Sequence, residues 1–264
     1  MVVDTIITDM DDTLFNEEGK ISEFTLGVMK KCLEQGIRVI PSSGRAQASM
    51  EPYMRQLNTG LPYIACNGGQ LVNADHTLMD NLCLSPQVAQ DICAYLAAND
   101  YYAQVYRDEY VYYAQECTPS EDYKRSSGLK GEAVGDLVKF ITFDTPKVLC
   151  ISDPKRIEEL YPRIVEHFSN VATFSISKPF FLEAMPPEAT KGAAIHRLAA
   201  KMPISPEKTF VFGDSLNDIS MLAYTKNSVA VGNARDEVKA VARYICRPNS
   251  EDGMARFIQE NLLH

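Results

Sequence analysis

Four short apolar runs along the chain each stop at a cluster of polar residues. They are "VVDTIIT" before Asp9, "IRVIP" before Ser42, "YIAC" before Asn67 and "KTFVFG" before Asp214. Their length and β-branched content predict buried strands, and the helical stretches between strands predict a parallel α/β sheet with right-handed crossovers. Ligands of such sheets bind beyond the carboxyl ends of the strands, so we expect the four polar clusters to meet at one edge.

The segment between residues 83 and 186 has a different character. It contains a Tyr-rich block with two short adjacent strands, a polar stretch, further strands and a helix start at Asp153-Pro154. We therefore predict a Rossmann-like α/β core over residues 1–82 and 187–264, with residues 83–186 inserted as an α+β domain that has its own core. Within the α/β core, residues 22–35 are predicted to form an amphipathic helix, with Ser22 as its N-cap.

Charge and composition restrict the possible partners. The formal net charge is −9 and the pI is near 5.0, which disfavours nucleic acid because that affinity comes from basic side chains. The seven cysteines are scattered without a CxxC pair, so neither a disulfide framework nor a zinc site is expected. No apolar run approaches the roughly 20 residues that span a bilayer, and the first residues lack a basic signal region. We expect a cytoplasmic protein without a membrane partner, and the sequence leaves the oligomeric state open.

Three carboxylates, those of Asp9, Asp11 and Asp12, directly follow the first predicted strand. Close carboxylates repel one another unless a cation or a shared proton relieves them. Magnesium prefers carboxylate oxygens, and beside such a cation Asp9 can attack phosphorus while Asp11 transfers protons. A solvated acidic turn is the alternative interpretation of this segment taken alone.

Other polar clusters have both a catalytic and an ordinary interpretation. Asp214 and Asp218 in "GDSLND" could complete a cation site with the first acidic cluster, or could belong to a capped helix start. Ser43 in "SSGR" could hold a phosphate oxygen or cap a turn. Lys191 opens a predicted helix, where the helix dipole disfavours a cation, and this position indicates a nearby anion. Asn67 could contact a ligand or simply form a turn.

Six motifs taken in order resemble the haloacid dehalogenase (HAD) superfamily. They are "DMDDT" (9–13), "SSGR" (42–45), "CNGG" (66–69), "TKG" (190–192), "GDSLND" (213–218) and "NSEDGMARFI" (249–258). The insertion is similar to the Cof-type, or type IIB, cap. The resemblance implies that the cap supplies most contacts for substrate specificity and that hinges lie near residues 81–85 and 185–190.

The resemblance also implies a role for each matching position. Asp9 would attack the phosphoryl group and form an aspartyl-phosphate, while Asp11 would protonate the leaving alcohol and later activate water. Ser43 and the Gly44 backbone would hold phosphoryl oxygens. Lys191 would neutralise the charge of these oxygens and orient Asp9.

A magnesium ion is the cofactor that the resemblance implies. Its ligands would be the Asp9 carboxylate, the Asp11 main-chain carbonyl and Asp214, and Asp218 would support the site through water or through hydrogen bonds to the ligands. Asp12 stands where the family more usually has glycine, which affects the turn beside the site.

Two asparagines and one serine complete the implied site. Asn217 would contact Lys191 or the phosphate, and Asn67 would touch the substrate or the phosphate. Ser43 replaces the commoner threonine of the family but keeps the hydroxyl.

The leading prediction is a magnesium-dependent phosphatase that hydrolyses a small phosphorylated metabolite, with a sugar phosphate preferred. A phosphomutase of the same superfamily is an alternative because such enzymes share the aspartyl-phosphate. A phospho-accepting receiver domain and an inactive regulator are alternatives from another class. The length, the insertion and the motif order argue against a receiver domain, and the presence of Asp9, Asp11, Lys191 and Asp214 argues against an inactive regulator.

Overall fold

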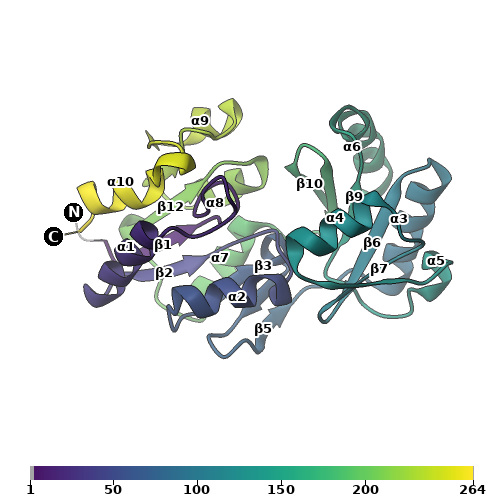
Figure 1. Cartoon of the computed structure of the whole chain (residues 1–264), viewed down its shortest axis with the longest axis horizontal. Helices are drawn as coiled ribbons and strands as arrows, with labels where there is room; N and C mark the ends of the chain where they lie inside the picture. The colour runs from purple at the N-terminus through teal and green to yellow at the C-terminus, as the bar shows by residue number, and fades with distance from the viewer. Residues whose placement is uncertain (1–2, 264) are drawn as a thin grey trace.

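The computed structural model describes residues 3–263, and its centre is a parallel sheet (Figure 1). The strand order is β14-β13-β12-β1-β2, and every pairing in this sheet is parallel. The predicted first strand begins at Thr5 in the structure, and residue 2 of the prediction lies outside the described residues. The strands are β1 (Thr5–Thr8), β2 (Arg38–Pro41), β12 (Thr209–Gly213), β13 (Ser228–Ala230) and β14 (Tyr244–Ile245).

The adjacent strands β12, β1 and β2 of this sheet end within one residue of one another. Thr8 at the end of β1 pairs with Phe212 of β12 on one side and with Pro41 of β2 on the other. The residues that follow these strands therefore emerge side by side. This register brings the acidic and hydroxyl motifs to one edge of the sheet, as the sequence predicted.

Helices pack against the parallel sheet in two contacting groups, α1 with α2 and α10, and α8 with α7 and α9. The predicted helix at residues 22–35 is confirmed as α1. Ser22 is its N-cap, because the Ser22 hydroxyl accepts a hydrogen bond from the Thr25 N–H at 3.0 Å. No helix in the described part of the chain has the length and apolar character of a bilayer span. The bounds are α1 (Glu23–Glu34), α2 (Gln47–Leu57), α7 (Lys191–Ala199), α8 (Ile219–Leu222), α9 (Asp236–Val241) and α10 (Gly253–Asn261).

The third predicted strand runs parallel to its neighbour but lies outside the five-stranded sheet. It touches the parallel sheet through a single bridge between Ser42 and Ile64. The chain then reverses at η1 (Cys66–Gly68), and the third strand pairs antiparallel with the next one. The predicted parallel direction of this strand is confirmed at that bridge, and the turn at Gly68, with φ +96°, folds the following strand back against it as a hairpin. The strands of this small sheet are β3 (Tyr63–Ala65), β4 (Gln70–Val72) and β5 (Leu78–Asn81).

The inserted segment forms a second sheet with the order β10-β11-β9-β6-β7-β8, which Figure 1 shows as a separate lobe. All pairings are antiparallel except that between β7 and β8. This confirms the predicted α+β cap, and its own apolar core lies between the sheet and its helices. The strands are β6 (Tyr102–Arg107), β7 (Tyr110–Tyr113), β8 (Lys130–Ala133), β9 (Val148–Ile151), β10 (Thr173–Lys178) and β11 (Phe181–Met185), and the helices are α3 (Pro86–Ala98), α4 (Thr118–Ser127), α5 (Leu137–Phe140) and α6 (Pro154–Phe168).

The cap and the core also share a buried apolar cluster. Ala46 and Cys66 of the core pack in this cluster, which is otherwise made of cap side chains. The cap members are Tyr106, Val111, Tyr113, Tyr123, Leu129 and Leu149. Apolar burial of this kind stabilises the contact between the two parts without specifying its geometry.

Two helical glycines allow a test of how tightly α7 is packed. A Cβ atom at Gly192 would lie 2.3 Å from the backbone oxygen of Ser220, whereas a Cβ at Gly27 in α1 would meet nothing within 4 Å. We expect Gly192→Ala to lower the free energy of unfolding by about 1–3 kcal/mol through overpacking. The control Gly27→Ala is expected to raise it by about 0.5–1 kcal/mol. Urea unfolding of both variants measures this, and equal effects would contradict the close approach of α7 to Ser220.

Candidate active site

A buried lysine lies at the centre of the strand-end motifs. Lys191 is the first residue of α7 and is 1% exposed. Its Nζ contacts Asp9 Oδ1 and lies 2.5 Å from Asp218 Oδ1. Burial lowers the pKa of Lys191, but the two carboxylates more than offset this, so its pKa lies above the ordinary value and the ammonium stays charged.

Three aspartates surround this ammonium. Carboxylate oxygens of Asp9, Asp214 and Asp218 lie within 4.8 Å of one another. The Thr13 hydroxyl donates to Asp214 Oδ1 at 2.6 Å. Asp218 Oδ2 accepts from the backbone N–H groups of Asp214 and Ser215, each at 2.9 Å, so both of its oxygens already have protein donors.

Two of these aspartates, Asp9 and Asp214, have raised pKa values. Burial raises the pKa of Asp9 well above its ordinary value, and neighbouring carboxylates add to this effect while Lys191 opposes it. Burial and the Asp218 carboxylate raise the pKa of Asp214 to about 7. The cluster therefore favours the uptake of positive charge. Its oxygen-only donor set fits magnesium, which prefers carboxylate ligands.

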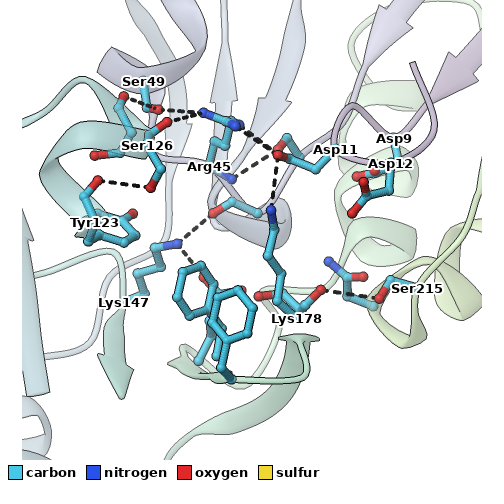
Figure 2. Close-up of a pocket in the computed structure, with 18 of the residues that line it drawn as sticks. Asp9, Asp11, Asp12, Arg45, Ser49, Tyr123, Ser126, Lys147, Lys178 and Ser215 are labelled. Carbon is cyan, nitrogen blue, oxygen red and sulfur yellow. Dashed lines mark hydrogen bonds and ion pairs between the residues drawn. The ribbon is translucent and has the colours of Figure 1, made fainter. Parts of the chain in front are cut away.

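Asp11 points away from this cluster and toward two cations (Figure 2). Arg45 binds its carboxylate through two hydrogen bonds of 2.7 and 2.8 Å, and Lys178 of the cap lies 3.6 Å from it. Burial alone would raise the pKa of Asp11, but the Arg45 hydrogen bonds and the two cations lower it below the ordinary value. The Asp11 side chain is thus held as a carboxylate.

The loop after β2 approaches its neighbours closely. The Ser43 N–H donates to the Ile64 carbonyl at 2.9 Å, and the Ser43 hydroxyl accepts from the Arg45 N–H at 3.1 Å. A Cβ at Gly44 would lie 3.0 Å from the Asn67 side chain and 3.3 Å from a Glu183 oxygen. Glycine at this position lets the backbone come this close to its neighbours.

Asn67 and Asn217 are joined by a hydrogen bond. Asn67 has a φ of +53°, which asparagine tolerates better than most residues, and its Oδ1 accepts from Asn217 Nδ2 at 2.8 Å. Asn217 Oδ1 is buried and has no hydrogen-bond partner among the described residues. Because Asn217 also lines the pocket, this oxygen offers an acceptor to a bound ligand.

A pocket of about 170 Å³ lies between the core motifs and the cap. Its core wall includes Asp9, Ser43, Gly44 and Asp214. The cap side includes Tyr123, Ser126, Lys147, Lys178, Phe181 and Glu183. The structure thus brings the predicted positions together in and around one pocket.

Several residues of this site were not predicted from the sequence. Arg45 and Thr13 lie inside two of the six sequence motifs, which did not predict a role for them. Lys147, Lys178 and Glu183 come from the cap. Glu183 sits inside the apolar run "FFLEAM", and Lys147 directly precedes the apolar run "VLC". A charge placed within an apolar strand is a signal for a buried pair, since such residues are almost never fully buried alone.

Asp12, which replaces the glycine usual in the family, keeps the turn geometry that glycine favours. Its φ is +60°, and its carbonyl accepts from Asn233 Nδ2 at 2.8 Å. Aspartate is among the residues that adopt this left-handed conformation most readily. Asp12 therefore places a carboxyl group at the pocket wall in a backbone conformation that is open to glycine as well.

A family model described as haloacid dehalogenase-like hydrolase matches residues 6–258, and the chain belongs to this family. It is 26% identical to the 5-amino-6-(5-phospho-D-ribitylamino)uracil phosphatase YwtE of Bacillus subtilis, over 97% of both chains. A solved haloacid dehalogenase-like hydrolase from Bacteroides thetaiotaomicron has a TM-score of 0.87 at 25% identity and covers 98% of this chain and 99% of its own. A sugar phosphatase of HAD subclass IIB shares the fold, with a TM-score of 0.84 at 19% identity over 98% of each chain.

These similarities confirm the predicted family and its type IIB cap. The chain is a phosphatase of the HAD family, and its class acts on small phosphorylated molecules. The receiver-domain alternative was wrong, because the family matches almost the whole chain, including the insertion.

The raised pKa of Asp214 gives the cation site a testable pH dependence. Without a cation, a folded-state pKa near 7 means that the stability contributed by the protonated carboxyl is lost as pH rises through about 7. Magnesium binds the ionised form, so we expect it to raise the melting temperature more at pH 8 than at pH 6. Thermal unfolding with magnesium and with chelator measures this. Asp214→Asn should abolish the difference, and an equal magnesium effect at both pH values would contradict the assignment.

Proposed function

We propose that this phosphatase uses magnesium and an aspartyl-phosphate intermediate to hydrolyse sugar phosphates or closely related phosphorylated polyols. The observation that carries the proposal is the buried Lys191 ammonium, which contacts the carboxylates of Asp9 and Asp218. A nucleophilic carboxylate that meets an anionic phosphate needs positive charge beside it, and this arrangement provides that charge.

Magnesium would be held by the Asp9 carboxylate, the Asp11 main-chain carbonyl and Asp214. Asp218 would support these ligands, because both of its oxygens already accept hydrogen bonds from the protein. When bound, the ion neutralises charge on the phosphoryl oxygens and on the carboxylates.

In the first half of the reaction, an Asp9 oxygen attacks phosphorus and the bond from phosphorus to the leaving oxygen breaks. Asp11 gives a proton to that leaving oxygen, and the alcohol departs. In the second half, water attacks the aspartyl-phosphate while Asp11 accepts its proton, which releases inorganic phosphate and restores the Asp9 carboxylate.

The contacts of Asp11 match one of these two roles directly. Arg45 and Lys178 hold it as a carboxylate, the form that accepts a proton from water. For the first half of the reaction, Asp11 must separate from Arg45 and carry a proton. Substrate entry between Asp11 and these cations would produce that separation.

The phosphoryl group would lie against the loop after β2. The Ser43 hydroxyl and the Gly44 backbone would hold its oxygens, and Lys191 would neutralise their charge. Asn217 and Asn67, which bond to each other, would contact the substrate or position the loop.

The cap supports the preference for a hydroxyl-rich leaving group. Ser126, Ser127 and Ser177 line the pocket, and each hydroxyl both donates and accepts hydrogen bonds, as sugar hydroxyls require. We propose that residues 83–186 act as the specificity cap and move on hinges near residues 81–85 and 185–190. The ribityl phosphate in the name of the Bacillus subtilis relative is in line with this substrate class.

The variant Asp9→Asn tests the nucleophile. We expect it to abolish phosphate release, with kcat reduced at least about 10⁴-fold, because an amide cannot form the acyl-phosphate. Circular dichroism should show an unchanged fold. Near-normal turnover by this variant would contradict the assignment of Asp9.

Substrate class and metal use are tested by phosphate release from a panel of sugar phosphates, nucleotides, pyridoxal phosphate and flavin mononucleotide. We expect the highest kcat/KM for a sugar or polyol phosphate and loss of turnover in chelator, because the acidic cluster needs its cation. An isomerised sugar phosphate in place of free phosphate would favour the phosphomutase alternative. Undiminished turnover in chelator would refute the magnesium requirement.

A further inference from the structure

A lysine and a glutamate of the cap form an ion pair buried at the boundary with the core. Lys147 directly precedes β9, Glu183 lies in β11, and each is only 2% exposed. Lys147 Nζ contacts Glu183 Oε1. A pair removed from water in this way is tolerated only where additional hydrogen bonds satisfy both groups, so their other partners decide its role.

The other partners of this pair belong to the core. Lys147 Nζ donates to the Gly44 carbonyl at 2.6 Å, and Figure 2 shows the lysine pointing toward that loop. The second oxygen of Glu183, Oε2, accepts from Asn67 Nδ2 at 2.5 Å. The hydrogen bonds of both charged groups are therefore complete only when the cap lies against the core.

The connection continues across the core through asparagine. Asn67 Oδ1 accepts from Asn217 Nδ2, so a single chain of hydrogen bonds joins Gly44, Lys147, Glu183, Asn67 and Asn217. These contacts connect the loops that follow β2, β3 and β12. The cap pair is thus connected by hydrogen bonds to three core loops that surround the pocket.

We infer that Lys147 and Glu183 are positioning residues that hold the loop of Ser43 and Gly44 in its phosphate-binding geometry when the cap is closed. The inference rests on the proposed function, because it takes this loop as the phosphoryl-binding element. Their hydrogen bonds go to Gly44 and Asn67, not to Asp9, so they act through the loop rather than on the reacting atoms.

This role differs from recognition of the leaving group, although both residues line the pocket. If the pair holds the loop in place, loss of the pair weakens binding of the phosphoryl group, which every substrate shares. A direct contact with the leaving group would instead affect only substrates that reach the cap. A small substrate such as acetyl phosphate, an acyl phosphate whose leaving group is acetate, therefore separates the two roles from each other.

The experiment measures kcat, KM and inhibition by inorganic phosphate in the magnesium-loaded enzyme for Lys147→Met and Glu183→Gln. The substrates are acetyl phosphate and the best sugar phosphate of the panel. We expect kcat/KM to fall by about 100-fold for both substrates, the loss typical of a small misplacement of a reacting group. The inhibition constant of phosphate should rise in parallel. The exposed cap pair Lys130 and Glu109 is the control. Lys130→Met is expected to change neither kcat/KM nor the inhibition constant of phosphate.

A loss limited to the sugar phosphate would overturn the inference and assign the pair to the leaving group. A lower melting temperature with unchanged kcat/KM and phosphate inhibition would also overturn it, because only a structural role would then remain. Since either single variant leaves a buried charge unpaired and could unfold, the double variant Lys147→Met/Glu183→Gln carries no such charge and is measured as well. Its full activity would overturn the inference, and its impairment would support it.

The proposed function fails in a different way. Absence of phosphate release by the unaltered enzyme, with magnesium and every ester of the panel, would refute the phosphatase mechanism itself. An active enzyme whose pair variants are unaffected would refute only the positioning role.

Discussion

The buried Lys191 ammonium makes the acidic edge of the parallel sheet possible. The strands β1, β12 and β2 end level, which places the carboxylates of Asp9, Asp214 and Asp218 within a few ångströms of one another. Several carboxylates at that distance, removed from water, would take up protons rather than stay ionised. Lys191 offsets part of their charge. The pKa values of Asp9 and Asp214 stay raised, first because both groups are buried and then because other carboxylates lie nearby, and a divalent cation would favour their ionised forms.

On another side of the pocket, the negative charge of Asp11 is balanced by the cations of Arg45 and Lys178. Arg45 also stacks over the rings of Phe15 and Tyr53, at 5.5 and 5.4 Å, so its guanidinium is anchored while it binds Asp11. Lys178 adds a cation from the cap to the same carboxylate. Asp11 is thus the core carboxylate that a cap residue reaches directly. The proposed movement of the cap would change the electrostatic surroundings of Asp11, the proposed proton-transfer group.

Much of the core could be predicted from the sequence because its signals are local. Each short apolar run predicts a strand, and the polar residues directly after it predict where ligands gather. The hairpin of β3 and β4 could not be read in this way, since the direction of β4 depends on the reversal after Cys66. The bonds of Arg45 with Asp11 and of Lys147 with Gly44 join residues 34 and 103 positions apart. Such pairs depend on tertiary folding, which local patterns do not encode.

The boundary between cap and core combines two kinds of contact with different consequences. The apolar cluster around Tyr106 and Leu149 favours closeness but tolerates small shifts, because hydrophobic burial has no directional preference. The hydrogen bonds of Lys147 and Glu183 act only over short distances and along restricted directions. Burial therefore supplies the affinity of the cap for the core, while the ion pair defines the position of the cap. With the proposed roles, pocket-lining side chains of the cap could differ with the substrate while the pair would keep the proposed phosphate-binding end of the site unchanged.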